Sequence, residues 1–197
     1  MSSQRSRAWS VAKAPTPVGP RLVAFLRAIN VGGHVVKMDV LRELFTGLGL
    51  TDVETFIASG NVLFRWGSDD RPALERKLEA RLREALGYEV KTFVRTEAEV
   101  AAIARYRPFP EPEIESARAF SVGFLAERPT PAARMLVLAQ KTDVDTFHVN
   151  GREVYWLCRV GQSDSEFSNV RFEKKVGLSV TFRGLKTITR LVAKYGT

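Results

Sequence analysis

The stretch that decides the fold is residues 21–66, RLVAFLRAINVGGHVVKMDVLRELFTGLGLTDVETFIASGNVLFRW. Residues 21–29 are apolar on both alternating faces, which predicts a central strand covered on both sides. Apolar residues at helical spacing then predict a helix over 38–48. Two strands follow within 53–66, joined by the turn residues Ser59-Gly60-Asn61. The stretch therefore predicts strand, helix, strand and strand in that order.

The rest of the chain completes this unit and repeats it. A helix at 69–86 and a strand at 88–95 close a βαββαβ order, and a short helix at 96–105 follows. The second copy is predicted as a strand at 118–126, a helix at 129–140, a hairpin at 144–158, a helix at 165–176, a strand at 178–182 and a last helix at 185–195. This order is that of the ferredoxin-like fold with antiparallel strand order 4-1-3-2. We predict an α+β protein of two tandem ferredoxin-like βαββαβ subdomains with antiparallel sheets.

The predicted elements divide the chain into a leader, two subdomains and a linker between them. Residues 1–20, rich in Ser and Pro and without apolar periodicity, are predicted to be a flexible leader. Residues 21–106 form the first subdomain with its linking helix, and the Pro-rich acidic stretch 107–116 is a linker. Residues 117–197 form the second subdomain with its C-terminal helix.

Composition bounds the class of protein. No apolar run approaches the roughly 18 residues that span a bilayer, so we predict no membrane association. Cys158 is the only cysteine, which rules out an intrachain disulfide and favours the reducing cytoplasm; its strand position predicts a buried thiol. Two histidines and one cysteine do not make a usual zinc site, so no metal and no cofactor are predicted.

The connectivity places two loops together. In this topology the loop after the first strand, Asn30–Lys37, lies at the same sheet edge as the hairpin turn at Ser59-Gly60-Asn61. Two glycines ahead of a helix suit an anion, since backbone N–H groups and the helix dipole both favour negative charge there. We predict a small anionic or nucleotide-like ligand at this edge, bound by Arg27, Asn30, Gly32, Gly33, Lys37, Ser59 and Asn61. The alternative is that both motifs are only turns. No catalytic residue is identified, and whether the protein is an enzyme stays open.

Two other classes of function remain. The net charge of +8 concentrates at the two ends of the chain, which favours a nucleic-acid-binding module using the basic N- and C-terminal segments. A non-catalytic interaction protein that forms a homodimer is the third. The strand at 118–126 carries the small residues Ala119, Ser121 and Gly123 on one face, and we predict that this face packs against the first subdomain or a second copy.

Two sets of motifs in the chain are specific enough to compare with known families. The most specific are Leu26-Arg27-Ala28-Ile29-Asn30-Val31-Gly32-Gly33 and Ser59-Gly60-Asn61-Val62. The others are Val94-Arg95-Thr96, Pro108-Phe109-Pro110, Gly151-Arg152-Glu153-Val154-Tyr155 and Thr187-Ile188-Thr189-Arg190-Leu191. Together these motifs resemble the DUF1697 family of uncharacterised bacterial proteins. The resemblance covers Arg21 to the C-terminus and implies two similar α+β subdomains, but no activity, cofactor or catalytic residue. This chain departs from the family pattern at Ala28, where members usually carry Gly, and at His34 and Val35, where they carry Lys or Arg and then Asn.

Overall fold

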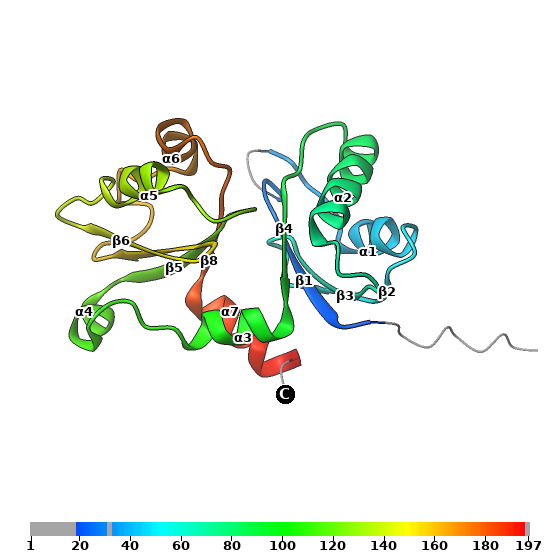
Figure 1. Cartoon of the computed structure of the whole chain (residues 1–197), viewed down its shortest axis with the longest axis horizontal. Coiled ribbons are helices and arrows are strands. Elements are labelled where there is room, and N and C mark those ends of the chain that lie inside the picture. Colours follow the sequence, from blue (N-terminus) through cyan, green and yellow to red (C-terminus); the bar gives the residue numbers. More distant parts are fainter. Residues whose placement is uncertain (1–18, 31–32, 196–197) are drawn as a thin grey trace, which may run out of the picture.

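The computed structural model describes residues 19–30 and 33–195. The predicted leader lies almost wholly outside the described residues, as does Gly32 of the predicted site. The fold is α+β, with two four-stranded antiparallel sheets (Figure 1). Each sheet belongs to one tandem ferredoxin-like subdomain, and we use the predicted division at 107–116 to name the two subdomains.

The first subdomain has the strand order β2-β3-β1-β4, as the sequence predicted. Its elements are β1 (Arg21–Leu26), α1 (Met38–Thr46), β2 (Thr51–Phe56), β3 (Asn61–Arg65), α2 (Arg71–Leu86), β4 (Thr92–Thr96) and α3 (Glu97–Arg105). The second subdomain has the matching order β6-β7-β5-β8. Its elements are β5 (Ala119–Phe124), α5 (Pro131–Leu138), β6 (Asp145–Asn150), β7 (Glu153–Cys158), α6 (Asn169–Val176), β8 (Thr181–Gly184) and α7 (Leu185–Tyr195).

Local sequence signals explain where several helices begin and end. The Asp70 side chain caps α2 by accepting from the Ala73 N–H, and Gly87 ends that helix in the left-handed conformation. A capping box of Thr96 and Glu99 is present at the start of α3. One helix was missed: α4 (Glu111–Ser116) lies inside the stretch predicted to be a linker, with acidic residues in its first turn.

Three apolar clusters form the core. The first lies between one face of the first sheet and α1 and α2, and the second lies between the second sheet and α5 and α6. The third joins the two subdomains, because the other faces of both sheets pack together with α3 and α7. Phe25 of β1 and Phe124 of β5 stack there with ring centroids 3.8 Å apart. Figure 1 shows α3 and α7 together on the lower side, where the two sheets meet.

The face of β5 that makes this contact differs from the prediction. Val122 and Phe124, not the small residues, belong to the cluster between the subdomains. Ala119 packs into the cluster below α5 and α6, and a side chain at Gly123 would meet the Phe182 ring at 2.7 Å. The prediction that the small face packs against the first subdomain is therefore wrong. Gly123 is small because the Phe182 ring lies across it within the same sheet.

In the part of the chain that the structure describes, no helix combines the length and the apolar character needed to cross a membrane.

Candidate functional site

The loop after β1 and the hairpin between β2 and β3 lie together as predicted, and the Asn30 side chain joins them. Asn30 Nδ2 donates to the carbonyl of Ala58 at 2.9 Å and to that of Val36 at 3.2 Å, and its Oδ1 accepts from the Val36 N–H. Its backbone is left-handed, with φ of 54°, a conformation that Asn tolerates better than most residues. The side chain predicted to contact a ligand thus ties the loop after β1 to the hairpin between β2 and β3.

The charged residues of this edge differ in their partners. Arg27 Nη2 pairs with Glu173 Oε2 on α6 of the other subdomain at 2.5 Å. Lys37 is exposed at the start of α1, and no side-chain bond to it occurs within residues 19–30 and 33–195. His34 stacks on Tyr88 with centroids 3.8 Å apart, so the segment after α2 also lies at this edge.

The hairpin turn Ser59-Gly60-Asn61 receives a guanidinium from the second subdomain. Arg183 Nη2 donates to the carbonyls of Ser59 at 2.6 Å and Leu26 at 2.7 Å, and its Nε donates to Asn61 Oδ1 at 2.7 Å. Gly60 is needed because its φ is +72° and a Cβ would stand 2.9 Å from Ile29. Burial lowers the pKa of Arg183 to about 10.

A second arginine, from the first subdomain, makes the same kind of contact with the second subdomain. Arg95 of β4 is fully buried and donates from Nη2 to the carbonyls of Leu125 at 2.7 Å and Arg152 at 3.3 Å. Its Nε donates to Glu153 Oε1 at 2.8 Å. Burial lowers the pKa of Arg95, while the Glu153 carboxylate opposes that shift. Each subdomain therefore inserts one arginine into the other.

The two arginines occupy matching positions in the two copies of the fold. Each is one residue from the end of the fourth strand of its unit, and each bonds the first residue of the returning hairpin strand, Asn61 or Glu153. The sequence carried a signal for this pair, because an arginine is the one charged residue in each of these strands and stands at the same place in both. The difference between the copies is that Arg95 has a carboxylate partner and Arg183 has an amide.

Another cavity lies away from this edge, between α4, β5 and α7. This groove has a volume of about 670 Å³. We call it the basic groove, and its main lining residues are Arg107, Arg118, Phe120, Leu185, Lys186 and Arg190. The charged residues that line it are four cations and no carboxylate. Among the residues described, none of these four cations forms an ion pair with an acidic side chain.

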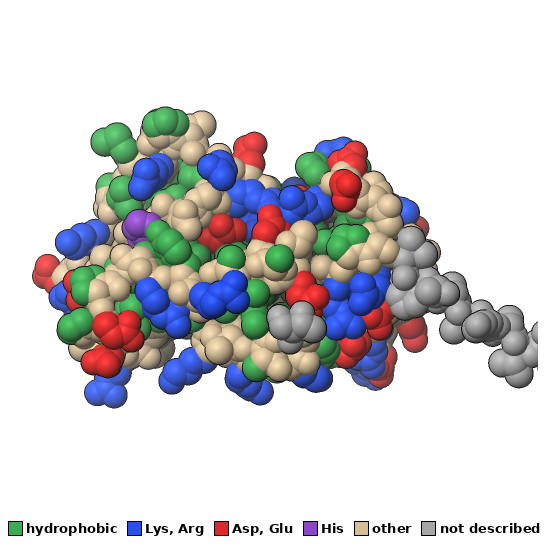
Figure 2. Space-filling model, turned by 60° about the horizontal axis from the view of Figure 1, so that its bottom comes forward, with side chains coloured by type: hydrophobic (Ala, Val, Ile, Leu, Met, Phe, Trp, Pro, Cys, Tyr) green, Lys and Arg blue, Asp and Glu red, His purple; other side chains and the backbone are tan. Residues whose placement is uncertain are grey.

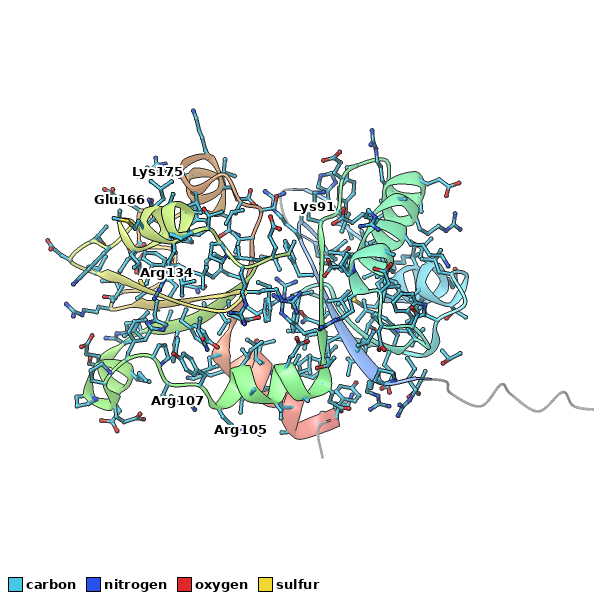
Figure 3. All side chains as sticks on the ribbon, in the orientation of Figure 1. Lys91, Arg105, Arg107, Arg134, Glu166 and Lys175 are labelled. Atoms are coloured by element: carbon cyan, nitrogen blue, oxygen red, sulfur yellow. The ribbon has the colours of Figure 1, made fainter. Side chains whose placement is uncertain are left out.

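The basic groove opens on the lower side of the molecule. Figure 3 places Arg107 on that side, between α4 and α3, where its Nη1 donates to the Ala104 carbonyl at 2.8 Å. Figure 2 brings this side forward and shows Lys and Arg side chains around hydrophobic ones. The nearest acidic helix, α4, directs Glu113 toward Arg159 at 3.9 Å. The positive charge of the groove is thus left without a neutralising partner from that helix.

The other described cavities are mixed in charge. The cleft between the subdomains, about 420 Å³, is lined by Glu75 and Glu79 as well as by Arg76 and Lys91. Lys91 already pairs with Glu79 at 3.0 Å. A surface that combines both signs favours no particular ligand charge, whereas a groove lined by cations alone favours an anion. The basic groove is therefore the better candidate for a binding site.

Sequence reasoning missed the basic groove because its cations lie far apart in the chain. Arg107 and Arg118 flank α4, while Lys186 and Arg190 lie on α7, and only the packing of α7 beside β5 brings them together. The one available signal was the excess of basic residues after Gly151. Cys158 is buried, as predicted. No group of three or more potential metal ligands occurs in the described chain.

Comparisons with known proteins agree with the fold. The model of the family described as "Protein of unknown function (DUF1697)" matches residues 20–155. The chain is also similar to the solved structure of the conserved bacterial protein SP0830 from Streptococcus pneumoniae, with 19% identity and a TM-score of 0.65, over 90% of this chain and 99% of that one. At this identity the likeness shows the fold alone. Among curated proteins, none matches.

Proposed function

The chain belongs to the DUF1697 family, whose function is unknown, and we propose from the geometry of this member that it binds a small anionic ligand in the basic groove. The observation that carries the proposal is the lining of that groove: four cations surround one cavity without a carboxylate among them. A volume of about 670 Å³ lies within the usual range for small-molecule sites, roughly 300–1,000 Å³.

Helix α7 adds to the attraction for an anion. Gly184, Leu185 and Lys186 line the groove where this helix begins, so its positive dipole end is on the same side. Lys186 and Arg190, four residues apart on α7, lie on one face of the helix. The groove thus combines side-chain charge with a helix N-terminus.

The sequence predicted the same class of ligand at a different edge. There, Arg27 is paired with Glu173, and the amides of Asn30 and Asn61 bond groups of the protein itself. Lys37 is the charged member of the predicted set that has no such bond in the residues described. Anion binding at that edge stays a prediction. We assign the ligand to the groove because, among the described residues, its four cations form no ion pair with an acidic side chain.

The test is a titration with pyrophosphate, followed by thermal unfolding and calorimetry. A ligand at 100 times its Kd stabilises the folded state by about 2.7 kcal/mol. For a chain of this size, that raises Tm by roughly 5–10 °C. The double variant Arg118→Gln/Lys186→Gln should lose the shift, while Lys37→Gln, made at the predicted edge, should keep it. If Lys37→Gln loses the shift and the double variant keeps it, the ligand belongs at the first edge and the proposal fails.

Nucleic acid is a second candidate because Lys186 and Arg190 belong to the basic C-terminal segment predicted to bind it. This reading expects binding of single-stranded RNA or DNA that weakens steeply with salt. Binding that survives 200 mM salt unchanged, or that is absent at 50 mM, would exclude it. Homodimer formation stays a prediction, which sedimentation at micromolar concentration checks.

A further inference from the structure

We propose that the outer edge of β6, together with the exposed side of α5, is the surface through which two copies of this chain pair. The two β6 strands lie antiparallel about a two-fold axis at His148 and join the two second sheets into one. Three observations support this surface: the backbone groups that β6 leaves unpaired, the apolar side chains exposed on α5, and opposite charges at the two ends of the edge. The surface shares no lining residue with the basic groove, so it does not depend on the anion site.

Three of the four sheet edges carry a feature that hinders pairing with another strand. The outer strands of the two sheets are β2, β4, β6 and β8. Along β4, each outward N–H donates to a glutamate: Thr92 to Glu79 Oε1 at 3.0 Å, Val94 to Glu75 Oε1 at 2.7 Å and Thr96 to Glu99 Oε2 at 2.7 Å. At the start of β8, the Val180 N–H donates to Glu173 Oε1 at 2.8 Å. A bulge between Thr51 and Glu54 interrupts β2. Carboxylates and bulges are both known ways to keep an edge strand from pairing.

The edge of β6 has neither feature. This strand pairs with β7 along its whole length without a register shift, and no strand lies beyond it (Figure 1). The Arg159 N–H bonds the Val144 carbonyl, which fixes the alternation of the ladder. Even-numbered residues of β6 therefore bond β7, and odd-numbered residues direct their N–H and C=O groups outward.

Two of the three outward residues of β6 have no backbone partner. The N–H and C=O of Asp145 are used within its own turn, by the side chain and the N–H of Thr142. Within the described chain, the N–H and C=O of Phe147 and Val149 form no hydrogen bond. Their side chains are buried against α5, so the edge presents backbone groups rather than charged side chains.

A second β6 supplies the missing partners. With the axis at His148, the N–H and C=O of Phe147 bond those of the partner's Val149, and Val149 bonds the partner's Phe147 in the same way. His148 faces the partner's His148 as a non-hydrogen-bonded pair. Both unpaired residues are used, and a two-fold axis makes the edge complementary to itself.

The helix beside this edge is apolar on its exposed side. α5 packs on β6, and Val137 is its one fully buried residue. Met135 is 72% exposed and Leu138 is 38% exposed, although a helix that is hydrophobic all round is normally buried. Antiparallel pairing of β6 brings both α5 helices to the same face of the joined sheet, where they cover each other's apolar side chains. A single extended peptide would fill the strand edge but leave α5 exposed, so a second copy fits the surface better.

The charges at the two ends of the edge suit antiparallel pairing. Asp143 is exposed just before β6, and Arg128 is exposed at the other end, where it lines one cavity with Asn150 and Gly151. Neither Asp143 nor Arg128 forms an ion pair among the described residues. Antiparallel pairing lays one end of β6 against the opposite end of its partner, so Asp143 comes near the partner's Arg128. This complementarity favours a second copy in that orientation.

Sedimentation velocity on the full chain tests the surface. We expect a dimer at micromolar concentration. Leu138→Lys should weaken the dimer at least tenfold, because it places a charge in the apolar contact between the two α5 helices. Val35→Lys is the matched control, since Val35 is 87% exposed on the first subdomain, and it should dimerise as the unmodified chain does. A monomeric chain, or equal dimerisation of the two variants, would overturn the proposal.

A cysteine cross-link tests the position of the axis. Residues opposite each other in a non-hydrogen-bonded pair have Cβ atoms about 4.5–5.5 Å apart, so His148→Cys should form a disulfide between copies on mild oxidation. Thr146→Cys should not, because it faces the partner's Asn150 and lies roughly 13 Å from its own counterpart. Cys158 is buried and does not compete. A dimer in which His148→Cys stays reduced, or in which Thr146→Cys cross-links equally well, would show that the copies meet elsewhere.

Discussion

Replacing Arg183 with methionine tests the main contact between the subdomains. Methionine fills much of the same space but removes the Arg183 donor from the carbonyls of Leu26 and Ser59 and from the Oδ1 of Asn61, all in the other subdomain. A buried acceptor left unsatisfied costs roughly 1–3 kcal/mol. Part of this cost is offset, because the variant no longer has to bury a cation that lacks a carboxylate partner. We expect a net loss of about 3–5 kcal/mol in the free energy of unfolding.

Urea unfolding followed by circular dichroism and by tryptophan fluorescence measures this loss. For a chain of this length, it corresponds to a fall in Tm on the order of 10 °C. Arg171→Met is the matched control, since Arg171 is exposed on α6 and should change stability by less than about 0.5 kcal/mol. A loss below about 1 kcal/mol for Arg183→Met would mean that the guanidinium contacts do not hold the subdomains together, and would refute this reasoning.

Three other predictions concern stability. Ala28 has φ of 61°, so Ala28→Gly should raise the free energy of unfolding by about 1 kcal/mol by relieving the left-handed strain; an unchanged urea midpoint would contradict this. Asn30→Ala should lower the free energy of unfolding by about 2 kcal/mol without any ligand, because it removes the hydrogen bonds to Val36 and Ala58. A free energy of unfolding equal to that of the unmodified chain would contradict the role of Asn30 in joining the loop to the hairpin. Burial raises the pKa of Glu75, so its share of stability is present below about pH 4.5 and is lost as pH rises through the raised value. Glu75→Gln can still accept from the Val94 N–H at 2.7 Å, and its urea midpoint should fall less between pH 4.5 and 7 than that of the unmodified chain.

Apart from the short helix α4, the sequence by itself determined the order of elements, and it also determined the pairing of strands. Residues 21–29 are apolar on both faces, and that pattern favours a strand covered on both sides, which is where β1 lies. Helix ends followed from local chemistry at Thr96, Glu99 and Gly87, because capping and left-handed turns depend on neighbouring residues. The nearness of the Asn30 loop to the first hairpin followed from connectivity alone.

Only the tertiary structure decided what those residues do there. Asn30 and Asn61 are polar residues in turns, and the sequence does not show whether such a side chain faces a ligand or another part of the protein. The partner of Asn61 is Arg183, 122 positions away, and contacts of that range depend on how the two subdomains pack. The lining of the basic groove also depends on long-range packing, since α7 must lie beside β5 before its cations come near Arg107 and Arg118. Local pattern fixes local structure because its causes are nearby in the chain, whereas long-range contacts are selected by the packing of whole surfaces.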